Sequence, residues 1–363
     1  MTMHGAFGVL TEMNVEMPMR DGVALRGNLW RPDAAGSFPA LLMRTPYGKS
    51  VGGFERYVRA GYAVLCQDSR GRYASDGDFV VFSEPKHQEA EDGYDSVEWV
   101  AQQSWCNGRV GTMGASYCAW MQWTLARLRP PHLLAMAAVS IPTTLADVDW
   151  WGAFRPGRRI KWWLGTLAPD LRKRAGMPPP HTPAEARQIW DELEHGRWLG
   201  LLPWSEVVNH LPPPLADHVA SWLADPGRKP WKFAEAHKAI TVPNLDVTGW
   251  YDHCCSIAHL PAMQQDGASE TARSQTKLVI GPYAHNTLGK RVCNDVDFGA
   301  QAQLDQDGLK IRWFDHWLKE LDNGADREPA VRYFVMGAGR WESSPTWPPP
   351  GGGESTFFLA SDG

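Results

Sequence analysis

Three residues of the sequence have the side chains that acyl transfer requires, and each lies within a few residues of the end of a short apolar run. They are Ser116, Asp252 and His285. Serine alone is a poor nucleophile, but a histidine within hydrogen-bond reach can take its proton. A buried carboxylate can in turn orient the imidazole. These residue types, in this order, indicate the nucleophile, the acid and the base of one site.

The segment around Ser116 predicts a strand, a sharp turn and a helix. An apolar run with two glycines occupies 110–115, and 117–126 contains neither glycine nor proline. A serine on such a turn exposes its hydroxyl and leaves backbone N–H groups at a helix N-terminus for a developing oxyanion. The usual elbow is G-x-S-x-G, and Cys118 stands where the last glycine would be. The alternative is a packing glycine followed by a serine that caps the helix.

Asp252 and His285 also have simpler interpretations. Asp252 could be a turn or cap residue, and His285 a loop histidine, one of 12 histidines in the sequence. A metal site is a rival explanation for the nitrogen and sulfur ligands that cluster in this region, at His253, Cys254, Cys255 and His259. These four form neither a C-x-x-C nor an H-x-x-x-H pair. We therefore expect no metal site and no required cofactor.

The order of the elements predicts an α/β fold with a mostly parallel sheet. Helical patterns separate short apolar strands, and an antiparallel hairpin over 13–30 precedes them. The strands are expected at 40–44, 62–66, 133–139, 242–248 and 277–280, and the helices at 89–102 and 301–321. Because the carboxyl ends of parallel strands share one edge, Ser116, Asp252 and His285 should meet there.

Two regions differ from this pattern. Residues 143–240 are rich in Trp and Pro, with helical patches at 183–195 and 215–224, which indicates a helical insertion over the carboxyl edge of the sheet. After residue 324, strands are expected at 331–336 and 355–359. With few partners, these strands would present exposed edges.

Composition limits the classes of partner. The chain has 363 residues, of which 43% are hydrophobic and 21% charged, and a net charge of −5 without a Lys/Arg cluster. A nucleic-acid partner is therefore not expected. There is no apolar run of membrane-spanning length and no secretory signal. The six cysteines lack C-x-x-C spacing, which favours reduced, buried thiols in a cytoplasmic protein.

Several motifs together resemble those of the cocaine esterase/X-prolyl dipeptidyl aminopeptidase-like (CocE/NonD) hydrolases, which include α-amino-acid ester hydrolases and glutaryl-cephalosporin acylases. The matches run from about residue 15 to the end of the sequence. They include Arg44-Thr45-Pro46-Tyr47, Gln67-Asp68-Ser69-Arg70-Gly71-Arg72, Ser75-Asp76-Gly77-Asp78-Phe79, Glu91-Asp92-Gly93-Tyr94-Asp95, Gly114-Ala115-Ser116-Tyr117, Gly249-Trp250-Tyr251-Asp252 and Gly281-Pro282-Tyr283-Ala284-His285.

The resemblance implies an α/β-hydrolase fold and a role for each site residue. Ser116 would be the nucleophile, Asp252 the triad acid and His285 the base. The hydroxyl of Tyr47 would join the backbone N–H of Tyr117 in the oxyanion hole, since a phenol can donate to an oxyanion without being charged. The chain departs from the family pattern at Ala119, where the family has glycine and the added methyl would tighten the packing of the helix against the strand. It departs again at His253 and the two cysteines that follow, whose bulk near the acid could alter the pocket.

The resemblance also implies a division of the chain. The α/β-hydrolase core would span 10–142 and 241–325, with a helical cap at 143–240. Residues 326–363 would begin a jelly-roll-like β domain that is incomplete here, so the sequence is either a fragment or a member without that domain. Tryptophans of the cap could wall an acyl pocket or form the core of the cap: Trp150, Trp151, Trp162 and Trp163.

The sequence thus predicts a serine hydrolase that cleaves an ester or amide of a small molecule or short peptide through an acyl-enzyme. X-prolyl dipeptidyl peptidase and β-lactam acylase activity are alternatives, as is a non-catalytic binding protein with the same fold. Peptide and amino-acid ester substrates need a carboxylate for a free ammonium, for which Asp147 and Asp149 are candidates. The acyl group, the leaving group and the oligomeric state stay open.

Overall fold

The computed structural model describes most of the chain, including every predicted strand of the sheet. The described residues are 7–82, 88–144, 160–194, 201–211, 213, 215–224, 236–252, 254–353 and 355–358.

The first half of the chain forms a six-stranded sheet in the order β1-β2-β4-β3-β5-β6. β1 and β2 form the predicted antiparallel hairpin, and β2 pairs antiparallel with β4. The pairs β3–β4, β3–β5 and β5–β6 are parallel, as expected. The strands are β1 (Gly8–Pro18), β2 (Ala24–Asp33), β3 (Phe38–Thr45), β4 (Ala63–Asp68), β5 (Cys106–Ala115) and β6 (Leu133–Val139).

The second half continues the sheet in the order β7-β8-β11-β12. A parallel bridge between Met136 and Asn244 joins the two halves, and the Asn244 side chain reinforces it by accepting from the Ala138 N–H at 2.8 Å. β7, β8 and β11 are parallel, whereas β12 is antiparallel. These strands are β7 (Leu245–Gly249), β8 (Lys277–Gly281), β11 (Val331–Val335) and β12 (Arg340–Ser344), and a short separate hairpin pairs β9 (Val292–Cys293) with β10 (Val296–Asp297).

Helices cover both faces of the sheet, which explains the continuous apolar runs of its strands. Neighbouring residues of β3 enter different cores: Leu42 packs with α2 (Gln88–Ala101) and α3 (Tyr117–Ala126). Leu41 packs with α1 (Glu55–Arg59) and α11 (Gln306–Lys319) on the opposite face. The short helices α9 (His259–Asp266) and α10 (Glu270–Gln275) lie between β7 and β8, preceded by a 3-10 turn at Cys254–Ala258.

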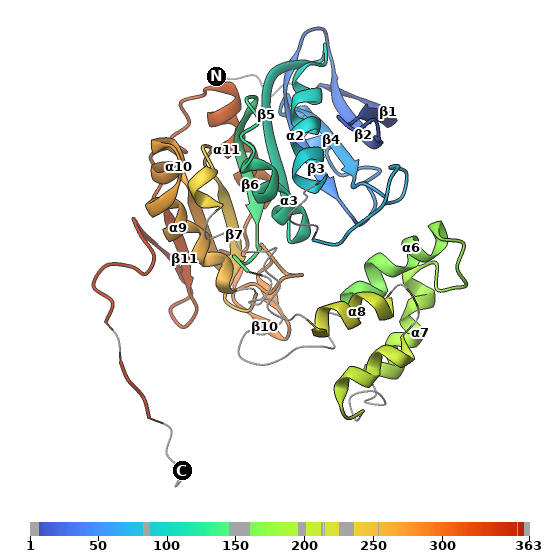
Figure 1. Ribbon diagram of the computed structural model, residues 1–363. Helices are drawn as coiled ribbons and strands as arrows, with labels where there is room; N and C mark the ends of the chain where they lie inside the picture. Colours follow the sequence, from blue (N-terminus) through green and yellow to red (C-terminus); the bar gives the residue numbers. More distant parts are fainter. Residues whose placement is uncertain are drawn as a thin grey trace.

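Between residues 143 and 240, the described segments contain helices and no named strand, as the sequence predicts. Figure 1 shows α6, α7 and α8 grouped to one side of the sheet. The elements are a π-helix at Trp163–Leu167, α6 (Ala168–Arg174), α7 (Pro183–Glu194), a 3-10 helix at Trp204–His210, α8 (Leu215–Ala224) and a 3-10 turn at His237–Ala239.

Two predictions for the C-terminal part are wrong. Residues 355–358 of the strand expected at 355–359 form no strand, and Phe357 and Phe358 are 90% and 89% exposed. The prolines and glycines at 348–353 separate this stretch from the sheet. β11 has no open edge, because it pairs with β8 on one side and with β12 on the other. β12 escaped prediction because its sequence, Arg340–Ser344, is polar.

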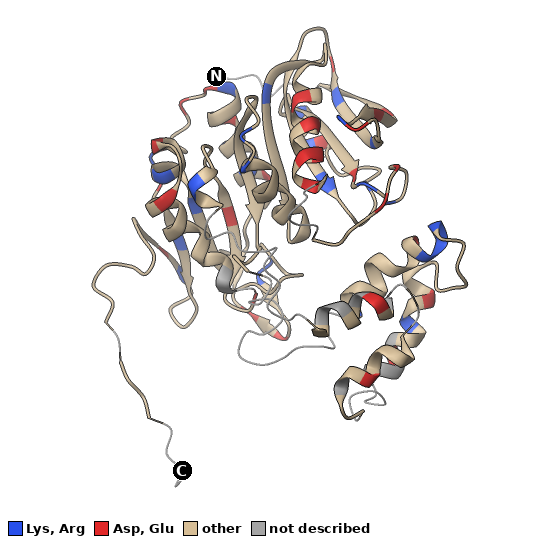
Figure 2. Ribbon diagram, viewed as in Figure 1, with Lys and Arg blue, Asp and Glu red and all other residues tan. Residues whose placement is uncertain are grey.

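Charged side chains of one sign are grouped on particular helices. Figure 2 shows acidic residues along α2 and basic residues at the end of α6, with both signs scattered over the other elements. No helix in the described ranges is long and apolar enough to cross a membrane.

Candidate active site

Ser116 occupies a strained turn between β5 and α3. Its backbone has φ 60° and ψ −124°, a left-handed conformation that is uncommon for residues other than glycine. The Ser116 N–H donates to the Val139 carbonyl at 2.9 Å, which ties the turn to the end of β6. The side chain is half-buried and makes no capping hydrogen bond to α3, so the helix-cap alternative does not account for this serine.

The glycine two residues before Ser116 is required by close packing. Gly114 has φ 149°, and a Cβ there would lie 2.6 Å from the Cβ of Cys118. Cys118 is 4% exposed, and burial raises the pKa of its thiol to about 12. Cys118 therefore fills the position of the usual second glycine as an inert packing group, and Gly114 provides the space for it.

Asp252 and His285 lie at the carboxyl ends of β7 and β8. Two backbone hydrogen bonds join the following loops: Trp250 N–H to the Gly281 carbonyl and Tyr251 N–H to the Tyr283 carbonyl, both at 3.0 Å. The His285 Nδ1 atom is 2.9 Å from Oδ1 of Asp252. A carboxylate can only accept, so Nδ1 is the nitrogen that carries the hydrogen. The Asp252 side chain is 1% exposed and that of His285 33% exposed. Asp252 therefore orients a histidine that solvent and substrate can reach.

The contact between the proposed nucleophile and the proposed base is the remaining feature of the site. Within the described part of the chain, no hydrogen bond connects the Ser116 hydroxyl to the His285 ring. Such bonds are often long in proteins without substrate and shorten when substrate binds. With Nδ1 engaged by Asp252, Nε2 is the ring nitrogen that could take the serine proton.

Two polar residues that the sequence analysis missed surround Asp252. The Ser140 hydroxyl donates to Oδ2 of Asp252 and lies 3.4 Å from Nδ1 of His285. The Ser140 N–H donates to Oδ1 of Asp246 at 2.8 Å. Burial raises the pKa of Asp246 to about 8, so this carboxyl is largely protonated at neutral pH. An aspartate within the buried strand β7 was the signal in the sequence that could have revealed this second carboxyl.

Tyr47 lies beside the Ser116 turn, immediately after β3. Its ring packs edge-on against the ring of Tyr117, with the centroids 6.3 Å apart, and its hydroxyl oxygen accepts from the Trp162 indole N–H at 3.1 Å. The Tyr117 phenol is engaged elsewhere, since it accepts from the Phe82 N–H at 2.9 Å. The backbone N–H of Tyr117 is in the first turn of α3, where it has no partner within the helix.

A fully buried arginine fixes the loop that contains Tyr47. Arg72 donates from Nε to the Pro46 carbonyl at 2.8 Å, and from Nη1 to the Leu167 carbonyl at 2.8 Å. Burial lowers the pKa of Arg72, and Asp170 at 3.4 Å opposes this shift. Arg72 therefore connects the residue before Tyr47 to the π-helix that follows Trp162.

The tryptophans expected at the pocket differ in their burial and in their neighbours. Trp162 is half-buried and stacks on the ring of Phe82, with the centroids 5.8 Å apart, close to Tyr47. Trp163 is 4% exposed and belongs to the larger core. The other expected pocket residues lie outside the described residues: Trp150, Trp151, Asp147 and Asp149.

The described residues contain no group of three or more potential ligands that could hold a metal ion. Of the rival ligand set, His253 and the side chains of Cys254 and Cys255 lie outside the described residues. His259 is buried and stacks on Trp123, and its Nδ1 and Nε2 atoms contact His237 and the Ile141 carbonyl at 2.9 and 3.0 Å. These contacts explain His259 as part of the core.

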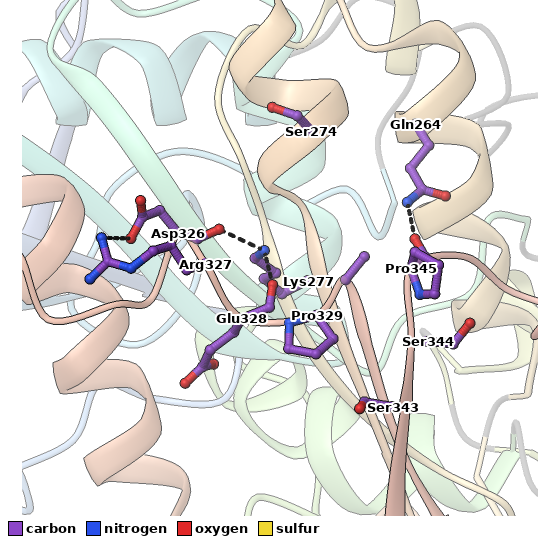
Figure 3. Close-up of a pocket in the computed structure, with 11 residues that line it drawn as sticks. Gln264, Ser274, Lys277, Asp326, Arg327, Glu328, Pro329, Ser343, Ser344 and Pro345 are labelled. Atoms are coloured by element: carbon purple, nitrogen blue, oxygen red, sulfur yellow. Dashed lines mark hydrogen bonds and ion pairs between the residues drawn. The ribbon is translucent and has the colours of Figure 1, made fainter.

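A separate hollow of about 500 Å³ lies at the opposite end of β8 from His285. Figure 3 shows Lys277, the first residue of β8, directed at the backbone of the segment that precedes β11. Its ammonium donates to the carbonyls of Asp326 at 3.3 Å and Glu328 at 2.5 Å. The polar groups of this hollow thus fasten β8 to β11, and the hollow is not part of the site around Ser116.

Comparison with known proteins gives a consistent result. A family model described as X-Pro dipeptidyl-peptidase (S15 family) matches residues 21–287. Cocaine esterase from Rhodococcus sp. (strain MB1 Bresler) is 30% identical over 96% of this chain, which spans 62% of that relative's length. Two solved structures share the fold over 94% of the chain. An aminopeptidase from a marine sediment Thaumarchaeota archaeon has a TM-score of 0.68 at 20% identity, with 59% of its chain covered. A CocE/NonD family hydrolase from Staphylococcus aureus has a TM-score of 0.62 at 23% identity, with 57% covered.

Proposed function

The chain belongs to the X-Pro dipeptidyl-peptidase (S15) family and has the α/β-hydrolase fold, and on this premise we propose that it is a serine hydrolase. The reaction would be cleavage of an ester or amide acyl bond through an acyl-enzyme, with Ser116, His285 and Asp252 as the triad. The observation that supports this most is the 2.9 Å contact between His285 and the buried Asp252. It occurs at the strand ends where a strained serine turn also lies.

In the proposed mechanism, the Ser116 hydroxyl attacks the substrate carbonyl carbon while Nε2 of His285 takes its proton. Asp252 holds the ring through Nδ1 and stabilises the imidazolium. The tetrahedral intermediate carries its negative charge on the former carbonyl oxygen, which the Tyr117 N–H and the Tyr47 hydroxyl would stabilise. The intermediate collapses when His285 returns the proton to the leaving oxygen or nitrogen. Water, activated by the same histidine, then hydrolyses the acyl-enzyme.

An ester with a neutral acyl group is the substrate class that the described residues favour. The rings in contact with Tyr47 are those of Tyr117 and Trp162, and the ring of Phe82 stacks on both of these. All of these rings are uncharged. Such rings suit an apolar acyl group. An X-prolyl peptide or an amino-acid ester needs a carboxylate near the site, and Asp147 and Asp149 remain the candidates for that role. The family description keeps X-Pro dipeptidyl-peptidase activity as the alternative.

The organisation of the chain is part of the proposal. We retain an α/β-hydrolase core at 10–142 and 241–325, followed by residues 326–363, whose strands β11 and β12 pair onto β8 of that core. We also retain a helical cap at 143–240, in which Trp150, Trp151 and Trp162 would contribute to the pocket while Trp163 packs in the core. A cytoplasmic location fits the four described cysteines, all of which are free and buried.

A hydrolysis panel tests the proposed function. It comprises aryl esters of increasing acyl length, an amino-acid ester, a Gly-Pro amide and a β-lactam, each with wild type and with Ser116→Ala. We expect the aryl esters to be cleaved fastest and Ser116→Ala to abolish the activity. Faster cleavage of the Gly-Pro amide would favour the peptidase alternative. No cleavage of any compound by folded protein would support a non-catalytic role.

A further inference from the structure

We propose that Ser140 is a positioning residue that locks the carboxylate of Asp252 in the orientation the histidine needs. The inference rests on the proposed function, because it gives Ser140 a role only if Asp252 orients His285 during catalysis. It adds to the triad a residue from a fourth strand end, that of β6, which the sequence does not mark by any motif.

The contacts of Ser140 place it between the members of the proposed triad. Its hydroxyl donates to Oδ2 of Asp252, while Oδ1 of the same carboxylate accepts from Nδ1 of His285 at 2.9 Å. Each carboxylate oxygen therefore has its own donor, and rotation about the last side-chain bond of Asp252 would break both hydrogen bonds. The Ser140 side chain is also 3.4 Å from Nδ1 of His285, so it closes the space beside that contact.

The backbone of Ser140 indicates that its side chain matters. The residue is fully buried and has φ 54°, in the left-handed region that favours glycine. A residue other than glycine in this region is strained, and strain of this kind is concentrated at functional sites. Glycine would relieve the strain at this position. The hydrogen bond from the Ser140 hydroxyl to Asp252 is therefore the feature that explains a serine here.

A second carboxyl group fixes the serine itself. The Ser140 N–H donates to Oδ1 of Asp246 at 2.8 Å, and Asp246 is 3% exposed on β7. The backbone and the side chain of Ser140 thus bind two different aspartates, Asp246 in β7 and Asp252 after it. Because the pKa of Asp246 is raised to about 8, its carboxyl is mostly neutral at pH 7, and the charge beside His285 is that of Asp252.

Three variants test this role by their steady-state kinetics on the best ester of the panel. Ser140→Ala and Ser140→Gly both remove the hydroxyl, and each should lower kcat by about tenfold, the low end for a hydrogen bond to a charged group. KM should change little, because the hydroxyl contacts Asp252 and not the substrate. The two variants should differ in stability: the glycine variant should have the higher Tm, since alanine retains a Cβ at positive φ.

The third variant, Asp252→Asn, separates this inference from the proposed function. Alone, it should lower kcat by about 10⁴ through the wrong imidazole tautomer. Adding Ser140→Ala to it should lower kcat by less than about twofold more, because the carboxylate that Ser140 positions is already gone. Equal effects of Ser140→Ala in both backgrounds would overturn the positioning role. So would a kcat for Ser140→Ala and Ser140→Gly within about threefold of wild type. A loss below about tenfold for Asp252→Asn would instead contradict the proposed acid and, with it, this inference.

Discussion

Replacing Tyr47 with phenylalanine removes one hydroxyl from the proposed oxyanion hole and leaves the aromatic ring. The ring makes edge-on contacts with Tyr117 and Trp162, with centroids 6.3 and 6.4 Å apart, and phenylalanine can keep both. The loop position should also persist, since it depends on the bond from Arg72 to the Pro46 carbonyl. The variant therefore tests the hydroxyl alone.

The expected loss follows from what the hydroxyl does. Pro46 has no N–H, so in the loop after β3 the first donors available to an oxyanion are those of Tyr47 and the residues after it. The Tyr47 N–H already donates to Oγ1 of Thr45 at 3.1 Å, which leaves the phenol as that residue's donor. Loss of one oxyanion donor costs about 2.7–4 kcal/mol, or roughly 10²–10³ in kcat, with little change in KM if the bond forms mainly in the transition state.

The Trp162 indole supplies a matched second variant. Its N–H donates to the Tyr47 oxygen at 3.1 Å, which restrains the phenol and makes its own hydrogen a better donor. Trp162→Phe deletes that N–H, and we expect kcat to fall by about 3- to 10-fold in wild type, the range of a neutral hydrogen bond. In the Tyr47→Phe background the same change should have almost no effect on kcat, because its acceptor is gone.

The assay is kcat and KM for wild type, the two single variants and the double variant, with Tm as the folding control. A kcat for Tyr47→Phe within about threefold of wild type would refute the oxyanion role and leave the tyrosine as packing. Additive losses in the double variant, or a selective rise in KM for bulky acyl groups, would show that Trp162 acts as a pocket wall independent of Tyr47.

Two predictions concern stability. The pKa of Asp246 is about 8 in the folded protein, above the ordinary aspartate value of 3.8, so the folded state holds an extra proton between these values and loses stability as pH rises through that window. Asp246→Asn should therefore flatten the decline of Tm between pH 4 and 8, and an unchanged slope would mean that this carboxyl is not responsible. Gly114→Ala should lower the free energy of unfolding in urea by more than about 1 kcal/mol, because its Cβ would meet Cys118. Gly108→Ala is the control, with φ 82° but no atom nearer than 3.7 Å to the added Cβ, and an equal loss there would assign the effect to φ alone.

Much of the fold could be predicted because apolar runs, and the glycines and prolines that separate them, are local features of a sequence. β6 and β8 lie within one residue of the strands predicted at 133–139 and 277–280. The helix α8 has the same bounds as the helical pattern predicted at 215–224. β12 could not be predicted in this way. Its stability comes from pairing with β11 and from Trp341, whose indole N–H donates to the Gln301 carbonyl at 2.7 Å, and neither is visible in its polar sequence.

The site was predictable in part for a similar reason. Ser116, Asp252 and His285 follow strands that could be recognised, and parallel pairing places strand ends together. Ser140 and Asp246 were missed because their role depends on contacts between β6 and β7 that only the folded chain creates. The contact between Trp162 and Tyr47 likewise joins residues 115 positions apart. Local patterns thus indicate which residues can react, whereas the groups that orient them depend on tertiary packing.

The measurement that tests the central claim most directly is covalent labelling with a fluorophosphonate probe, followed by mass spectrometry of the peptides. The claim is that Ser116 is the activated nucleophile. We predict one adduct, on the peptide that contains Ser116, and none in the Ser116→Ala or His285→Ala variants, because the probe requires a serine whose proton a base can take. An adduct on a different serine, or unlabelled wild-type protein that is demonstrably folded, would contradict the account.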